Sequence, residues 1–171
     1  MSNQVEGEFK EKVDGAMLTM DKAMDEVSAV VGAMSHGDFS KRINMELRGS
    51  LGELKNNVNA SINNVALAIN DVTKAIDAQA QGNFSWQIEG QHRGELKTLT
   101  HNINQSMASI NAAISELGEV FKHIGEGDYS IRIRGRMRGD LDVMKTDINL
   151  SLTDLDKAIS EIVSVAKDQE G

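Results

Sequence analysis

Histidine is the residue of this sequence best suited to metal binding or proton transfer, and the chain has four of them. They are His36, His92, His101 and His123. A helical metal site usually carries two histidines four residues apart, and none of these pairs has that spacing. His36 also lacks the Glu-Leu-Arg-Thr-Pro phrase of a kinase phosphoacceptor site. We therefore expect all four to be solvated or to cap helix ends, and we predict no metal and no cofactor.

Acidic residues are numerous, with 26 Asp and Glu against 18 Lys and Arg, but they are spread along the chain. Covalent catalysis needs a nucleophile beside a general base, and the sequence assembles no such pair. The glycines recur at regular intervals and form no phosphate-binding loop. The sequence predicts that this chain is not an enzyme.

The net charge of −8 opposes binding to nucleic acid or to an anionic membrane surface. A local exception is an alternating basic strip made of Arg132, Arg134, Arg136 and Arg138. We expect this strip to be a solvated edge that pairs with nearby acids, and contact with an anionic partner is the alternative.

Cysteine is absent, which excludes a disulfide scaffold and fits a reducing compartment. No apolar stretch approaches the roughly 18–20 residues of a membrane span. The first ten residues lack the apolar core of a signal peptide. We expect a cytoplasmic segment that makes no membrane contact itself, within a parent that is either soluble or anchored upstream.

An internal repeat organises the chain. Gly-Asp-Phe-Ser at 37–40 returns as Gly-Asn-Phe-Ser at 82–85 and as Gly-Asp-Tyr-Ser at 127–130, so the step is 45 residues both times (37 to 82 to 127). Ile43, Ile88 and Ile133 keep the same step, as do Asn59, Asn104 and Asn149. A fixed period of this length predicts an array of one supersecondary unit.

Each repeat is expected to contain one long helix, the second running from Leu51 to about Gln81. Its apolar residues recur in steps of 4 and 3, which is the a/d seam of a coiled coil. Because many of them are β-branched and have weak helix propensity, packing against a partner must hold the helices. The seam residues predicted to form a bundle core are Met20, Met24, Val27, Val31, Val58, Ile62, Val65, Ile69, Val72, Ile76, Ile103, Met107, Ile110, Ile114, Leu117, Phe121, Ile148, Leu152, Leu155 and Ile159.

The seam is irregular near the start of each helix after the first. Leu51, Leu54, Val58, Ile62 and Val65 are spaced 3, 4, 4 and 3, and the two later copies repeat this spacing. Two consecutive steps of four form a stutter, which locally unwinds a supercoil. It is either a fixed adjustment where two bundles join or a junction at which helix rotation passes between units.

Connectors at roughly 37–50, 82–94 and 127–139 separate the helices. Each opens with a glycine that can adopt positive φ and close the preceding helix: Gly37, Gly82 and Gly127. Each also holds two apolar residues four apart, which we interpret as pegs that pin the connector to the helices: Phe39 and Ile43, Phe84 and Ile88, Tyr129 and Ile133. The following helices are predicted to start at Ser50, Leu51 and Glu53, at Glu95 and Leu96, and at Asp140 and Leu141. Ser50 and Glu53 have the pattern of a capping box.

Connector length indicates the topology. About 13 extended residues reach roughly 40 Å, whereas a half-helix of about 15 residues is ~22 Å long. The connector can therefore run back along one helix and start the next helix parallel to it. A second chain would then complete a four-helix bundle. The competing prediction is an α-solenoid, whose repeats carry two or three helices each.

These residues resemble the HAMP signalling module, in which a Gly-led connector with two pegs is followed by an acidic residue, a Leu and an Asn-bearing helix. The resemblance covers three units, at 16–66, 67–111 and 112–160, with a lead-in at 1–15 and a helix at 161–171 that continues toward an absent output domain. It implies an all-α fold: a parallel homodimeric coiled coil of three stacked four-helix bundles joined by continuous helices. The chain lacks the first-helix Pro usual in HAMP units next to a membrane, which is similar to internal poly-HAMP arrays.

The resemblance also implies a function. HAMP arrays relay conformational change from a sensory input domain to a methylated signalling domain or a kinase output domain of the same parent chain. Phrases such as Asn102–Ser106 and Ala158–Ile162 are similar to methyl-accepting chemotaxis proteins. A sensor or hybrid histidine kinase is the alternative parent, and a passive coiled-coil spacer is the alternative function.

Overall fold

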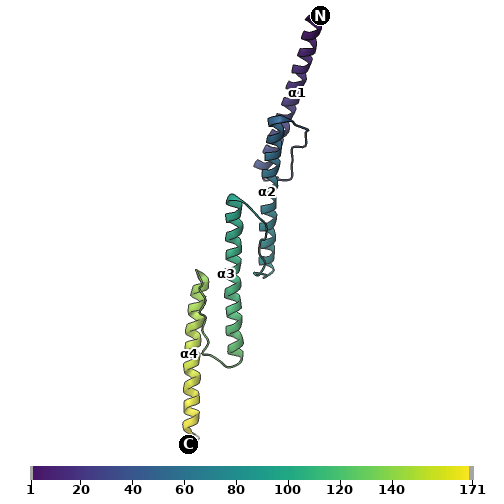
Figure 1. The fold of residues 1–171 in the computed structure, drawn as a ribbon. Coiled ribbons are helices and arrows are strands. Elements are labelled where there is room, and N and C mark those ends of the chain that lie inside the picture. Colours follow the sequence, from purple (N-terminus) through teal and green to yellow (C-terminus); the bar gives the residue numbers. More distant parts are fainter. Residues whose placement is uncertain (1, 170–171) are drawn as a thin grey trace. The chain divides into compact units, whose positions relative to one another are not determined.

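The computed structural model describes residues 2–169, which form four helices: α1 (Ser2–Ser35), α2 (Gly49–Ala80), α3 (Gly94–Gly125) and α4 (Asp140–Gln169) (Figure 1). No strand occurs in this part of the chain. The predicted all-α class is therefore confirmed. The helix expected from Leu51 to about Gln81 is α2, which begins two residues earlier and ends one residue earlier.

The first three helices end in the same hydrogen-bonded turn. In α1 the amide of Gly37 donates to the carbonyl of Met34 (2.9 Å) and the amide of Asp38 donates to the carbonyl of Ala33 (3.0 Å). This pair of bonds is the Schellman motif, which needs a left-handed residue at the position of Gly37. Gly37, Gly82 and Gly127 accordingly have φ of 80°, 76° and 81°.

A second glycine stands where each following helix begins. Gly49, Gly94 and Gly139 have φ of 60°, 56° and 58°. Because α2 begins at Gly49, Ser50 lies inside the first turn of the helix. The capping-box prediction for Ser50 was therefore wrong, since the glycine turns the chain into the helix one residue earlier than that pattern requires.

Two compact units can be distinguished in the described chain. One comprises the residues up to Lys74 together with Gly90–Thr98, and the other comprises Ala75–Glu89 together with the residues from Leu99 onward. In the first unit, the connector returns along α1, so that α2 starts beside α1 and runs in the same direction (Figure 1). In the second unit, α3 and α4 are arranged in the same way.

Each unit has a small core in which a connector isoleucine is packed between two helices. In the first unit the buried cluster is Val30, Ile43 and Ile62, and in the second it is Val120, Ile133 and Leu152. Burying a side chain of this size contributes roughly 1.5–3 kcal/mol relative to leaving it in water. The connector thus belongs to the core of each unit and is not a solvated linker.

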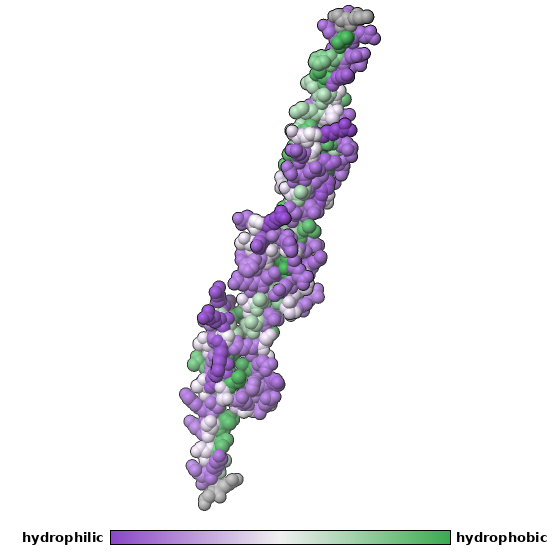
Figure 2. Space-filling view, viewed as in Figure 1, coloured by the Kyte–Doolittle hydropathy of each residue, from purple (hydrophilic) through white to green (hydrophobic). Residues whose placement is uncertain are grey.

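Much of the apolar seam lies at the surface of the single chain. Val30 is 4% exposed whereas the neighbouring seam residue Val31 is 48% exposed, because Val30 faces the connector and α2. Figure 2 shows apolar side chains reaching the surface along α1 and along α4.

Candidate functional site

The most regular polar feature of the structure is an asparagine side chain that holds the backbone of each connector isoleucine. The amide of Ile43 donates to Oδ1 of Asn59 (2.9 Å), and Nδ2 of Asn59 donates to the carbonyl of Ile43 (3.0 Å). We call this pair of bonds the Asn clamp. A carboxamide suits it because it carries one acceptor and two donors in a single plane.

The Asn clamp recurs in every connector. Asn104 binds the backbone of Ile88 with distances of 2.8 and 3.0 Å, and Asn149 binds the backbone of Ile133 with the same two distances. The clamped isoleucines are buried, with exposures of 1% for Ile43, 7% for Ile88 and 2% for Ile133. The other predicted pegs, Phe39, Phe84 and Tyr129, are half-buried. The peg side chain and the clamp thus hold the same residue from two directions.

A carboxylate adds a second attachment in the first and third connectors. Glu26 of α1 accepts hydrogen bonds from the amides of Asn44 (2.8 Å) and Met45 (3.1 Å). Glu116 of α3 accepts them from the amides of Arg134 (2.6 Å) and Gly135 (2.9 Å). Bonds to an ionised acceptor are shorter and stronger than neutral ones. No motif in the sequence marks either glutamate, because their partners are backbone groups.

Cationic side chains complete the attachment of these connectors. Lys55 donates from Nζ to the carbonyl of Met45 (2.9 Å), and Lys145 donates to the carbonyl of Gly135 (2.7 Å). Arg42 donates to the carbonyl of Phe39 (2.7 Å), and Arg132 donates to that of Tyr129 (2.7 Å). Each of these bonds satisfies a carbonyl that the irregular connector leaves without a partner in a helix or sheet.

This arrangement corrects the prediction for the basic strip. Arg132 is half-buried and binds backbone carbonyls. Arg134, Arg136 and Arg138 are exposed, and within residues 2–169 none of them forms an ion pair with an acid. The strip is solvated as expected, but the expected pairing with acids is not made.

The second residue of the repeated phrase has a structural role. Asp38 accepts hydrogen bonds at Oδ1 from the backbone amide of Ser40 (2.9 Å) and from its hydroxyl (2.6 Å). The side-chain hydrogen bond from Ser40, followed by the backbone bond, lowers the pKa of Asp38 below its usual value. Asn83 and Asp128 make the same turn with Ser85 and Ser130. The recurrence of the phrase therefore reflects a hydrogen-bonded turn at the start of each connector.

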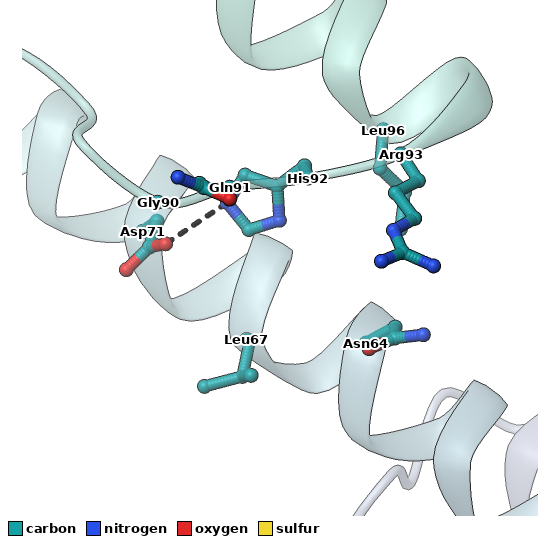
Figure 3. A pocket seen from close by; sticks show the side chains of 8 residues that line it. All are labelled: Asn64, Leu67, Asp71, Gly90, Gln91, His92, Arg93 and Leu96. Carbon is teal, nitrogen blue, oxygen red and sulfur yellow. Dashed lines mark hydrogen bonds and ion pairs between the residues drawn. The ribbon is translucent and has the colours of Figure 1, made fainter.

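The four histidines differ in whether an aspartate lies beside the ring. His36 Nδ1 lies 2.8 Å from the carbonyl of Gly32, which is the expected capping role, and His101 is exposed. His123 Nδ1 lies 3.0 Å from Oδ2 of Asp128. His92 Nε2 lies 3.0 Å from Oδ2 of Asp71, and its side chain is only 6% exposed (Figure 3). The expectation of a solvated or capping residue was therefore wrong for His92.

Among the residues that the structure describes, no group of three or more His, Cys, Asp or Glu side chains could hold a metal ion. No helix between residues 2 and 169 combines the length and the hydropathy that a membrane span requires.

The predicted bundle-core residues differ in how far the single chain covers them. The buried ones are Ile62, Met107 and Leu152. The half-buried ones are Val27, Val58, Val65, Val72, Ile103, Ile110, Leu117 and Ile148. The exposed ones are Met20, Met24, Val31, Ile69, Ile76, Ile114, Phe121, Leu155 and Ile159. The predicted helix-start residues Leu51, Leu96 and Leu141 are half-buried, whereas Ser50, Glu53, Glu95 and Asp140 are exposed.

Comparison with protein families explains this combination of parallel helices and anchored connectors. The family model of the HAMP domain matches residues 4–67 and 91–157, which is more than half of the chain. No curated protein and no solved structure matched it. HAMP domains are signal-relay modules of sensors and chemoreceptors and are not catalytic. This chain belongs to the HAMP domain family.

Proposed function

We propose that this chain is a relay of three HAMP units, at 16–66, 67–111 and 112–160, within a parallel homodimer. It passes a conformational change from an input domain to an output domain of the same parent chain. The observation that carries the proposal is the Asn clamp, which fixes Ile43, Ile88 and Ile133 in the same way. Ten residues after each clamp asparagine, the seam residue is exposed: Ile69, Ile114 and Ile159.

The uncovered seam favours a second copy of the chain as the partner. Ile69, Ile76, Ile114 and Phe121 follow the a/d spacing and are 48%, 55%, 48% and 64% exposed. Apolar surface contributes about 25 cal/mol for each Å² removed from water, so leaving this part of the seam uncovered is unfavourable. Two parallel helices from each of two chains would bury it as a four-helix bundle.

The connectors are fixed by polar bonds whereas part of the apolar seam is exposed, and this difference suits switching between two bundle packings. Connector and helices are held together within one chain by polar bonds that need no partner. The seam between chains is apolar and makes no such directional bonds, so it can repack without breaking the connector attachments. Packed interfaces of this kind change between discrete arrangements and do not deform continuously.

The parent that best fits is a chemotaxis transducer with a methylated signalling domain, and the segment acts in the cytoplasm. The phrases at 102–106 and 158–162 support this parent. A sensor or hybrid histidine kinase is the second candidate, supported by the same family membership.

Disulfide crosslinking of single-Cys variants tests the dimer, because the chain has no native Cys. Cys is introduced singly at Met20, Val65, Ile110 or Leu155, and each pair crosslinks if its Cα atoms approach within about 4.4–6.8 Å. We expect disulfide dimers at all four positions, which a parallel and in-register pair requires. Lys74→Cys, at a heptad position facing away from the seam, is the matched control and should stay monomeric on gels. Crosslinks confined to the central positions would mean antiparallel pairing, and their absence everywhere would mean a monomeric solenoid.

A further inference from the structure

The C-terminal part of α4 continues the 45-residue repeat beyond the third connector. The phrase Ala-Ile-Ser-Glu at 113–116, in the part of α3 that precedes a connector, returns at 158–161 (113 to 158). Val120 and Val165 keep the same step. Residues 155–169 therefore correspond to 110–124, and a helix that keeps the repeat has the same faces as its copies.

Two positions of this part of the repeat are buried in all three earlier copies. The first is held by Ala23, Ala68 and Ala113, which are at most 2% exposed, and the second by Val30, Ala75 and Val120, which are at most 4% exposed. In α4 the corresponding residues lie at the surface, since Ala158 is exposed and Val165 is 58% exposed. Thus α4 has the face that is covered in every earlier copy, but without its cover.

A carboxylate lies on the same side of α4. Glu161 and four apolar residues line one open hollow there: Ala158, Ile162, Val165 and Ala166. Glu161 follows Glu116 by 45 residues, and Glu116 accepts hydrogen bonds from two consecutive amides of the third connector. A carboxylate beside an apolar strip suits a connector, which brings both an apolar peg and backbone amides that need acceptors.

A second copy of the chain would cover a different side of α4. In α3, Ala113 is 2% exposed, whereas its neighbour Ile114, a seam residue, is 48% exposed. The face that is buried within one chain is therefore separate from the seam. Because Ile159 corresponds to Ile114, it belongs to the seam of the proposed homodimer, and Ala158 needs another partner.

We propose that residues 155–169 are the first helix of a fourth HAMP unit, whose connector and second helix are supplied by the parent chain after residue 171. In both described core clusters, the isoleucine that joins the valine of the first helix comes from the next segment of the same chain. This inference rests on the proposed function, because it adds a unit to the relay. The relay then passes its signal to a further HAMP unit before it reaches the output domain.

The register specifies what the covering segment contains. A glycine is expected at position 172 (127 to 172), where the left-handed turn ends the helix. An aliphatic peg is expected at position 178 (133 to 178), and an asparagine that clamps it at position 194 (149 to 194). Sequencing the parent gene past codon 171 checks the three positions, and a sequence that lacks any of them would overturn the proposal.

Alkylation of single cysteines in the full-length parent tests whether the face is covered. Residues 1–171 contain no Cys, and any Cys elsewhere in the parent is first replaced. Ala158→Cys and Val165→Cys should react with iodoacetamide at least about tenfold more slowly than Lys157→Cys, a change at an exposed position of the same helix. Ala113→Cys, at the buried position of α3, gives the rate of a covered thiol.

The 171-residue chain is the reference for this experiment. Without the covering segment, Ala158→Cys and Val165→Cys should react as fast as Lys157→Cys. If Ala158→Cys does not fold, Val165→Cys alone decides the result. Rapid alkylation of the folded parent at these positions would contradict the proposal.

A matched pair of glutamate variants shows whether the cover is a HAMP connector. Glu116→Ala should accelerate hydrogen exchange of the amides at 134 and 135, because it removes their acceptor. Glu161→Ala should do the same at positions 179 and 180 of the parent (134 to 179 and 135 to 180). Asp154→Ala, at an exposed position of α4, should change neither pair. Unchanged exchange at 179 and 180 in Glu161→Ala would mean that a different fold covers the face, and would refute the fourth unit.

The two proposals fail separately. The face of Ala158 and Val165 is predicted to be covered within one chain, so its protection does not need a dimer. Loss of the seam crosslinks with slow alkylation at both positions would contradict the homodimeric relay alone. Full crosslinking with rapid alkylation at both positions would contradict the fourth unit alone.

Discussion

At the scale of the residue, a carboxamide placed 16 positions after an isoleucine gives each connector a defined position. The side chain of Asn59 forms hydrogen bonds with both the amide and the carbonyl of Ile43, as a neighbouring β-strand would. An irregular segment has no ladder of its own, so its buried amides and carbonyls must be satisfied from outside. The clamp meets this requirement at the residue whose side chain is most deeply inserted.

The clamp predicts a graded loss of stability. Asn59→Asp keeps the acceptor but loses the donor, so it removes one bond of the two, and Asn59→Ala removes both. We expect the free energy of unfolding to fall by about 1–3 kcal/mol for each group left buried without a partner, with alanine the more severe change. Urea unfolding followed by circular dichroism measures the difference.

Asn63→Ala is the control for the clamp, because Asn63 lies in the same helix and is exposed. It should change stability by less than about 0.5 kcal/mol. If Asn59→Ala lowered the free energy of unfolding no more than Asn63→Ala, the clamp would make no contribution to stability.

At the scale of the element, the sequence predicted the helices well and their attachments poorly. The spacing of apolar residues placed α2 within two residues of its bounds, and Gly37 was correctly expected to close α1 with positive φ. The Glu26 and Lys55 bonds could not be predicted, because they join side chains to backbone groups of an irregular segment. His92 was misjudged because nothing in its immediate sequence reveals that Asp71 lies beside it.

Glycines in α3 and at its end offer a matched pair of substitutions. Gly127 has φ of 81°, and alanine there should destabilise the chain by about 1 kcal/mol because its Cβ disfavours the left-handed region. Gly118 lies inside α3 with nothing within 4 Å of a Cβ, and alanine there should stabilise by roughly 0.5–1 kcal/mol. The same chemical change thus has opposite signs at two sites nine positions apart in the sequence (118 and 127).

Thermal unfolding of Gly127→Ala and Gly118→Ala, followed by circular dichroism, checks both signs. A stabilising Gly127→Ala would show that the left-handed turn is not what ends the helix.

At the scale of the whole molecule, the question is whether the array transmits a signal or only separates two domains. A spacer could use uninterrupted heptads, whereas this chain has stutters at its helix starts and inserted connectors. These features favour the relay. All of these features are present in the sequence.

A peg substitution separates the two functions in the full-length parent. Ile88→Ala leaves a cavity beneath the middle connector, and we expect it to lock or invert the output while crosslinking through the seam persists. The output is measured as kinase activity or as the swimming response of cells. Gln87→Ala, a change at the exposed neighbour, should leave the output as it was. Normal output from a folded and dimeric Ile88→Ala protein would identify a passive spacer.

The Asn clamps also have a consequence for folding during synthesis of the chain. Each joins residues only 16 apart, and the glutamate attachments span 18 or 19. Contacts so local form quickly and need no distant part of the chain. A connector can therefore close onto its helices soon after its asparagine leaves the ribosome, while later repeats are still being synthesised. In the proposed homodimer, each repeat would then meet the second copy with its connector already in place, and pairing would be left to the seam alone.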